Sequence, residues 1–275
     1  IVSDIKHEHD TIFKFWMAFC VVNGSKLITS DLGGNYGGIF WHSIMHEDIS
    51  DFTIRWFKPI KKNNIQLPVL HLLSKQRKNK NNRKYLLTIG FGGTKYPKDI
   101  FIGPISGQIL YQVDQLDSFY KNLNIELKNS FFYRPNRYDH DWNFQKRLEP
   151  LFKNKIIPST KKYLHYFKMS KVIVCTQPKT AFCESMVTGP TVLLTKEKYH
   201  KNRDEFKELH ESLRKAKILF EDPIEASKHL NNVWKNVDDW WESEVVVDAR
   251  KKFMKEAALI ETNALEKWKN FFQSL

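Results

Sequence analysis

Five polar residues that could hold a ligand follow one short apolar segment, Lys171–Cys175 (KVIVC), which has the composition of a buried strand. They are Thr176, Gln177, Lys179, Thr180 and Glu184. A short helix follows and ends at Gly189-Pro190, and a second apolar strand is expected at Thr191–Thr195. Strand, helix and strand form a βαβ unit of a parallel sheet, and ligands bind such sheets at the carboxyl ends of the strands. The pattern therefore predicts a binding site at this turn.

A glycine-rich loop follows a short strand expected at Lys26–Thr29. Its glycines are Gly33, Gly34, Gly37 and Gly38. Residues without a Cβ atom let the backbone approach a ligand closely, although the spacing is not GxGxxG and a simple turn is the alternative. The segment Gly90–Thr94 (GFGGT) follows the strand expected at Tyr85–Ile89 and has the same two interpretations.

Two arginines, Arg134 and Arg137, follow a strand expected at Ser130–Pro135. A guanidinium group can bind a phosphate or a carboxylate through two parallel hydrogen bonds, so this pair suits an anionic ligand. The structural alternative is a surface ion pair with Asp139 or Asp141. The residues alone leave both interpretations open.

The segment HEHD (His7–Asp10) contains side chains that could bind a metal. No second group of ligands follows it in the sequence, so we expect a solvated helix start within a helical region over residues 1–22. Apolar residues at three- and four-residue spacing favour that helix, including Ile12, Trp16 and Phe19.

Cysteine usage and hydrophobicity limit the compartment. The odd count of three cysteines, Cys20, Cys175 and Cys183, has no CxxC spacing and favours a reducing cytosol over a disulfide framework. The longest apolar run, Phe13–Gly24, contains a lysine and is shorter than the roughly 20 residues of a membrane span. We therefore expect a cytoplasmic protein.

The formal net charge of +13 is compatible with nucleic acid, an anionic membrane surface or a negatively charged small substrate. Much of the charge lies in Lys75–Lys84 (KQRKNKNNRK), which has the composition of a solvated linker. No zinc-finger, homeodomain or RNP motif accompanies it, so we expect no nucleic-acid partner. Peripheral association with an anionic membrane stays open.

Strands and helices alternate from Tyr85 onward, which predicts an open, mostly parallel sheet with helices on both faces. Before it, Val69–Leu73 is expected as a short buried strand or turn, and Asp248–Phe272 as one long closing helix. The late tryptophans, such as Trp268, are expected to pack in the core or between domains, with carbohydrate stacking as the alternative.

Five segments, in this order, resemble a family of bacterial transferases associated with surface-polysaccharide (O-antigen or capsule) biosynthesis, of the GT-B glycosyltransferase type. They are SDLGGNYGGIFWHSIMHEDISDFTIRWF, IGPISGQILYQVDQLDSFYKNL, FFYRPNRYDHDWNFQKRLEP, VIVCTQPKTAFCESMVTGPTVLL and DDWWESEVVVDARKKF. Each segment alone is unspecific, but together they cover most of the chain.

The resemblance implies two Rossmann-like α/β domains that face each other across a cleft, with the nucleotide-sugar donor held mainly by the second. Residues 1–74 would end an N-terminal acceptor-side domain whose first residues precede Ile1, and residues 75–84 would form a basic linker. Residues 85–275 would form the nucleotide-sugar-binding domain, whose C-terminal helix crosses back to the first domain. The resemblance implies no cofactor and no metal beyond the nucleotide-sugar substrate.

The resemblance also assigns roles to residues. An HGGGYG-like loop is present as Asp31 to Gly37, with Asp31 where a histidine is expected, and it contains Gly33, Gly34, Tyr36 and Gly37. A TTFLE-like element is present at Lys179–Glu184. The implied donor contacts are Thr176, Gln177 and Thr180 on phosphate, Glu184 on the ribose hydroxyls, and Arg134 and Arg137 on the leaving nucleotide phosphate. The implied base is Asp31, Glu47 or Asp48.

The hypothesis is a metal-independent glycosyltransferase that moves a sugar from a nucleotide-sugar donor to a surface polysaccharide, with a glycan or lipid-linked acceptor. One alternative is a nucleotide-sugar epimerase of GT-B fold, which would need a paired acid and base at the cleft. The other is a non-catalytic module whose basic face binds a glycan or another polyanion.

Overall fold

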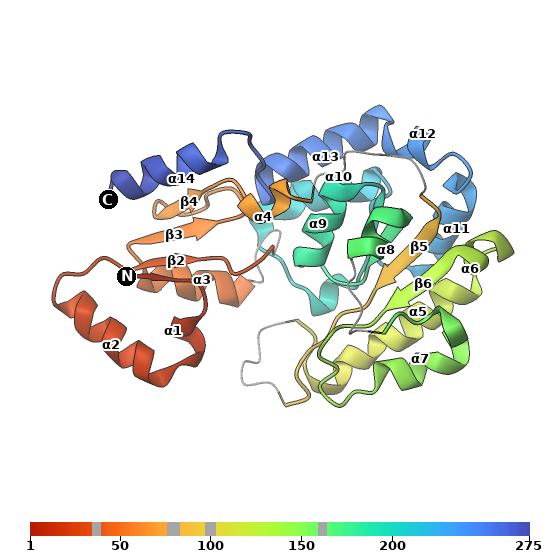
Figure 1. The fold of residues 1–275 in the computed structure, drawn as a ribbon, viewed down its shortest axis with the longest axis horizontal. Helices are drawn as coiled ribbons and strands as arrows, with labels where there is room; N and C mark the ends of the chain where they lie inside the picture. Colours follow the sequence, from red (N-terminus) through yellow and green to blue (C-terminus); the bar gives the residue numbers. More distant parts are fainter. Residues whose placement is uncertain (35–39, 76–82, 97–102, 159–163) are drawn as a thin grey trace.

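The computed structural model describes residues 1–34, 40–75, 83–96, 103–158 and 164–275, which form two lobes, each built on a parallel sheet (Figure 1). The first sheet has the order β1 (Val2–Ser3), β2 (Ile28–Ser30), β3 (Phe52–Arg55), β4 (Asn64–Gln66). The second has the order β6 (Phe131–Arg134), β5 (Tyr85–Ile89), β7 (Ser170–Cys175), β8 (Thr191–Leu194), β9 (Leu219–Phe220). The strand pairs of both sheets are parallel. The predicted α/β class with mostly parallel sheets is confirmed.

Helices cover both sheets. The first lobe contains α1 (Lys6–His9), α2 (Thr11–Val22), α3 (Phe40–Ile49) and, from the end of the chain, α14 (Ala264–Gln273). The second lobe contains α5 (Tyr111–Lys121), α6 (Ile125–Ser130), α7 (Phe144–Phe152), α8 (Leu164–Met169), α9 (Thr180–Thr188), α10 (Lys207–Lys215), α11 (Pro223–Val233), α12 (Val237–Trp241) and α13 (Glu244–Ala257). The short helix α4 (Leu70–Leu73) lies between the lobes (Figure 1).

The second sheet is buried on both faces. In β7, Val172 and Val174 belong to one core cluster, whereas Ile173 and Cys175 belong to another. Successive side chains of a strand point to opposite faces, so both clusters draw on the same apolar run. This explains why β7 shows no polar alternation in the sequence.

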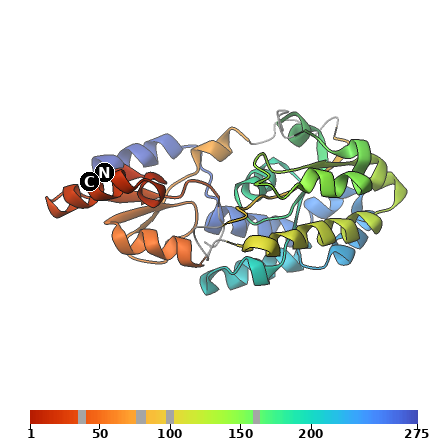
Figure 2. The ribbon, with the colours of Figure 1, turned by 90° about the horizontal axis from the view of Figure 1, so that it is seen from below.

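The C-terminal helix α14 returns to the first sheet. Figures 1 and 2 show α14 and α3 on opposite sides of that sheet, with both chain termini in the first lobe. The Trp268 indole N–H donates to the Pro68 carbonyl over 2.8 Å, and Phe271 packs edge-to-face on Phe52 with ring centroids 5.9 Å apart. Trp268 therefore packs on the core of the first lobe, which agrees with the packing role that the sequence predicts.

Several predicted elements differ in the structure. Residues 1–22 form a strand and two helices, because the Asp10 carboxylate accepts the Phe13 N–H and starts α2 anew. The sequence predicts a short buried strand or turn at Val69–Leu73, and the strand is wrong, since Leu70–Leu73 is helical. The expected single closing helix is divided into α13 and α14, with a break over residues 258–263 that lets the chain turn toward the first lobe.

Helix α2 is apolar but lies on the surface, with none of its residues buried. Its 12 residues span about 18 Å at 1.5 Å per residue, well short of a bilayer core of about 30 Å. In the described part of the chain, no helix has both the length and the apolar character to cross a membrane.

Candidate functional site

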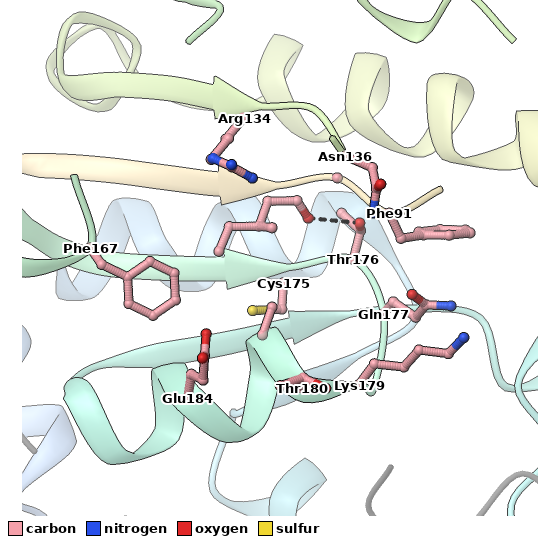
Figure 3. A pocket seen from close by; sticks show the side chains of 13 residues that line it. Phe91, Arg134, Asn136, Phe167, Cys175, Thr176, Gln177, Lys179, Thr180 and Glu184 are labelled. Atoms are coloured by element: carbon pink, nitrogen blue, oxygen red, sulfur yellow. Dashed lines mark hydrogen bonds between the residues drawn. The ribbon is translucent and has the colours of Figure 1, made fainter. Parts of the chain in front are cut away.

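A cavity of about 330 Å³ opens at the carboxyl ends of β5, β6 and β7 (Figure 3). Numbered along the chain, the five strands of this sheet have the spatial order 2-1-3-4-5, so the order reverses between β5 and β7. In doubly wound sheets such a reversal opens a crevice, because the connections on its two sides leave toward opposite faces of the sheet. The cavity therefore lies where the topology favours a ligand.

The cavity lining combines backbone, polar and charged groups. It consists of Ile89, Gly90, Phe91, Arg134, Asn136, Phe167, Cys175, Thr176, Gln177, Lys179, Thr180, Ala181 and Glu184. Figure 3 shows Phe167 and Glu184 on one side of the space, and Gln177 and Lys179 on the other.

Thr176 holds two walls of the cavity together. Its hydroxyl donates to the Ile89 carbonyl over 2.8 Å and lies 3.1 Å from Gln112 Oε1 (Figure 3 shows the first bond). The Gln112 amide in turn accepts the Phe91 N–H over 2.9 Å and donates to the Phe91 carbonyl over 3.1 Å. Gln112 is not among the predicted site residues, because no pattern in the neighbouring sequence marks a buried polar residue on an amphipathic helix.

The N-terminus of α9 forms the floor of the cavity. The Lys179 carbonyl accepts the N–H groups of Phe182 and Cys183, while the preceding Thr180 and Ala181 line the cavity. The first amides of a helix have no acceptor within the helix, and the helix dipole favours negative charge there. Burial lowers the pKa of the Lys179 ammonium group, which also lines the cavity. These groups suit a phosphate.

The two predicted arginines have different positions. Arg134 is the last residue of β6 and lines the cavity. Asn136, which is not among the predicted site residues, also lines it. Arg137 is exposed and is not among the lining residues. Its Cζ lies 5.5 Å from the centroid of the Tyr138 ring. The structure thus brings Arg134, but not Arg137, to the cavity.

Glu184 is buried on the first turn and a half of α9, and its Oε1 lies 2.5 Å from His71 Nε2. Lys75 Nζ lies 3.6 Å from the same oxygen. His71 belongs to α4, and about half of its side chain is exposed. The sequence analysis did not find His71, because its partner lies 113 residues further along the chain.

The glycine-rich loop approaches the same helix. A Cβ atom on Gly33 would collide with Thr180 Oγ1, and one on Gly34 would lie 2.5 Å from Cys183 Sγ and 2.9 Å from the Trp56 ring. Both glycines are therefore needed for close packing of the loop on α9. The predicted loop residues Tyr36 and Gly37 lie outside the described residues.

The three candidate bases are in ion pairs. Asp31 Oδ1 lies 2.6 Å from Arg55 Nη1, and Arg55 Nη2 lies 3.2 Å from Glu47 Oε1. Both Glu47 oxygens accept from Arg203 of the second lobe, over 2.8 and 2.9 Å. The exposed Asp48 pairs with Lys61 over 2.6 Å.

This arrangement bears on the base assignment. A proton taken up by Glu47 would have to break contacts with two guanidinium groups, and Asp31 is held by Arg55 and by the Trp56 N–H. None of the three carboxylates is among the residues that line the cavity. Their base role stays a prediction.

Comparison with solved structures identifies the fold. MurG of Acinetobacter baumannii superposes with a TM-score of 0.51 at 11% identity, covering 93% of this chain and 69% of that one. The H444N variant of the wall teichoic acid polymerase TagF superposes with a TM-score of 0.50 at 11% identity, covering 92% and 68%. Both are GT-B structures, so this chain has a GT-B-type fold of two α/β lobes.

Sequence comparisons place the chain in a family. No curated protein matches it by sequence. The family described as LIC12162 family transferase, however, has a sequence model that matches residues 1–272, nearly the whole chain. The chain therefore belongs to the LIC12162 family of transferases.

Proposed function

We propose that the chain is a glycosyltransferase that moves a sugar from a nucleotide-sugar donor to a glycan or lipid-linked acceptor of a surface polysaccharide. Membership of a transferase family and the GT-B-type fold support the general reaction. The single observation that carries the proposal is the cavity at the strand-order reversal. It combines an anion-binding helix terminus with a buried carboxylate one turn away, which are the groups that a nucleoside diphosphate needs.

The diphosphate of the donor would lie at the start of α9. Thr180 and Ala181 of the first turn of α9 line the cavity, as do the basic residues Lys179 and Arg134. As the glycosidic bond to the diphosphate breaks, negative charge develops on the leaving oxygen. Positive groups and helix amides fixed in advance stabilise this charge, and a metal ion is not required for it.

The ribose of the donor would lie against Glu184. A carboxylate can accept about four hydrogen bonds, so the contact between its Oε1 and His71 is compatible with one or two further bonds from ribose hydroxyls. His71 donates to Glu184 from the other side of the junction, and would fix the orientation of this carboxylate. The pair links donor binding to the relative position of the lobes.

Three further observations support the proposed acceptor and compartment. The GT-B-type wall teichoic acid polymerase TagF is a precedent for a cell-wall polymer as product. The buried, free Cys175 and Cys183 fit a reducing cytoplasm, where we place the reaction. The net charge of +13 would favour contact with an anionic membrane that carries a lipid-linked acceptor.

The test is nucleotide-induced thermal stabilisation of the full-length protein. We expect the melting temperature to rise with at least one of UDP, CDP, GDP or the corresponding nucleotide sugars. At a ligand concentration of 100 times Kd, binding adds about 2.7 kcal/mol to the free energy of unfolding. Arg134→Met should weaken this binding by about tenfold or more, since it removes a charge-assisted bond worth about 1.5–3 kcal/mol. Glu184→Gln should also weaken it, because an amide accepts fewer hydrogen bonds than a carboxylate.

Arg137→Met is the matched control, because Arg137 is an exposed arginine three residues away that does not line the cavity. It should bind nucleotide as the unmodified protein does. If no nucleotide or nucleotide sugar raises the melting temperature, or if Arg137→Met loses binding as strongly as Arg134→Met, the donor site is wrongly placed.

Incubation with the nucleotide sugar alone separates transfer from epimerisation. A transferase leaves the sugar configuration unchanged and consumes donor only when an acceptor is supplied. Conversion of the free donor to its epimer, followed by NMR, would favour the epimerase alternative instead.

A further inference from the structure

Three potential metal ligands from two helices meet in the first lobe. His7 and Glu8 belong to α1, and His46 belongs to α3, 38 residues further along the chain than Glu8. One ligand atom of each side chain lies within 4.8 Å of the others. His7 is 3% exposed and His46 is 1% exposed. The solvated helix start expected for His7 is therefore wrong.

The two imidazoles are held in fixed orientations. Ser3 Oγ lies 2.9 Å from His7 Nδ1, so Nε2 is the ring nitrogen that would serve as a ligand. His46 Nε2 lies 2.5 Å from Glu8 Oε1, and the two imidazole rings meet edge-to-face with centroids 4.5 Å apart. A histidine that binds a metal through one ring nitrogen commonly donates its other ring N–H to a hydrogen-bond acceptor, and the Ser3 hydroxyl is placed to accept from His7 Nδ1 in this way.

Ion pairing alone explains less of this cluster. Besides the close pair of Glu8 and His46, the cluster contains a second imidazole, that of His7, which is buried against the His46 ring and contacts Ser3. Two imidazoles and one carboxylate match the donor set that zinc takes with three protein ligands and one open position. Mg²⁺ prefers oxygen ligands and is not expected at a site with two nitrogen ligands.

We propose that His7, Glu8 and His46 bind one Zn²⁺ ion. The ion would join α1 to α3 beside the strand β1, which carries Ser3. None of its ligands lines the donor cavity, so the zinc would stabilise the first lobe and take no part in donor binding. The proposal is thus independent of the function proposed above.

The first experiment measures zinc on the full-length protein. After removal of metals with EDTA and dialysis, the protein should take up one equivalent of Zn²⁺ by isothermal titration calorimetry and by elemental analysis. The melting temperature should rise with Zn²⁺ and not with Mg²⁺, because only binding to the folded state adds stability. Co²⁺ in place of Zn²⁺ should give visible absorption bands typical of a four-coordinate site.

Variants assign the ligands. His46→Gln and Glu8→Gln should each weaken zinc binding at least tenfold, and Ser3→Ala should weaken it by about 10–100-fold as a supporting residue. His165→Gln, at an exposed histidine of the second lobe, is the matched control and should bind zinc unchanged. If His46→Gln fails to fold, the Glu8→Gln variant decides the question, because glutamine preserves the shape of the Glu8 side chain at the edge of the cluster.

The proposal is overturned if the EDTA-treated protein binds no zinc above the level of a nonspecific surface histidine. It is equally overturned if a folded Glu8→Gln protein, checked by circular dichroism, retains full zinc affinity.

Discussion

The two sheets use charged residues at their carboxyl ends in different ways. In the first sheet, Asp31 follows β2 and Arg55 ends β3, and their side chains pair directly over 2.6 Å. In the second sheet, Arg134 ends β6 and Thr176 follows β7, and the space between them is a cavity of about 330 Å³. Both edges carry polar side chains. At the second edge they surround a space for a ligand, whereas at the first edge the described residues Asp31 and Arg55 pair with each other.

Strand order explains the difference. The four strands of the first sheet that this chain contains run β1-β2-β3-β4 in chain order, and the ends of β2 and β3 are joined by the pair of Asp31 and Arg55. The second sheet reverses its order between β5 and β7, and its connections leave toward opposite faces. Charged residues at the carboxyl edge of a parallel sheet are therefore insufficient to identify a site, and the reversal decides which edge opens.

The comparison also separates two kinds of buried carboxylate. Glu47 is fully paired with Arg55 and Arg203 and connects the lobes. Glu184 is paired with His71 but faces the cavity. We interpret Glu47 as a structural residue of the junction and Glu184 as a ligand-binding residue.

The largest expected effect tests this interpretation of Glu47. Glu47→Gln should lower the free energy of unfolding by about 3–5 kcal/mol, because it leaves the buried Arg203 without its buried carboxylate partner and removes one carboxylate partner of Arg55, which keeps Asp31. Asp48→Asn, which removes an exposed carboxylate paired with Lys61, should change stability by at most about 1 kcal/mol. Urea denaturation measures both.

The opposite result would contradict the structural role of Glu47. If Glu47→Gln keeps its stability but loses sugar transfer, the ion pairs of the first lobe belong to the catalytic machinery. Glu47 would then be the base that accepts the proton of the acceptor hydroxyl.

A further cavity, of about 290 Å³, lies on the second lobe and is lined by charged side chains that pair with each other. It contains His210 and Arg214, and Arg214 pairs with Glu197 and Glu211. Burial, aided by the positive charge of Arg214, lowers the pKa of His210 to about 4. An unfolded histidine has a pKa near 6.5.

The sign of the pH effect follows. Between pH 6.5 and 4 the unfolded chain takes up a proton at His210 that the folded chain does not take up. The contribution of His210 to the free energy of unfolding is therefore fully present above pH 6.5 and falls as the pH decreases towards 4. The loss should approach about 2–3 kcal/mol by pH 4 for this group. His210→Gln should reduce this slope in urea denaturation at several pH values, and His165→Gln should not. An unchanged slope in His210→Gln would show that His210 is protonated in the folded state.

The sequence predicted the second lobe well, because strands that are buried on both faces leave short apolar runs bounded by turn residues. The strand β5 was predicted with its observed bounds, and β7 within one residue. Arg134, Thr176, Gln177, Thr180 and Glu184 were selected from the same pattern, and all line the cavity.

What the sequence could not supply depends on distant contacts. His71 meets Glu184 across 113 residues, and Gln112 meets Thr176 across 64. Arg134 and Arg137 are equivalent in the sequence, and only the path of the chain after β6 brings one of them to the cavity. The ion pairs of Glu47 likewise depend on Arg203 of the other lobe.

The smallest expected effect tests how the two sheet edges are joined. Gly34→Ala places a methyl group 2.5 Å from Cys183 Sγ and 2.9 Å from the Trp56 ring, so the loop must move away from α9. We expect a loss of about 1–3 kcal/mol in the free energy of unfolding, as for other overpacked sites. Gly107→Ala is the control, because its Cβ would meet nothing within 4 Å.

Nucleotide binding distinguishes a local from a shared effect. Cys183 precedes Glu184 on α9, so a displaced loop that shifts this helix should also weaken nucleotide-induced stabilisation in Gly34→Ala, whereas Gly107→Ala should keep it. If Gly34→Ala loses stability but binds nucleotide normally, the glycine loop only packs the lobes together. The donor cavity would then belong to the second sheet alone, and the strand-order reversal would be sufficient to form it.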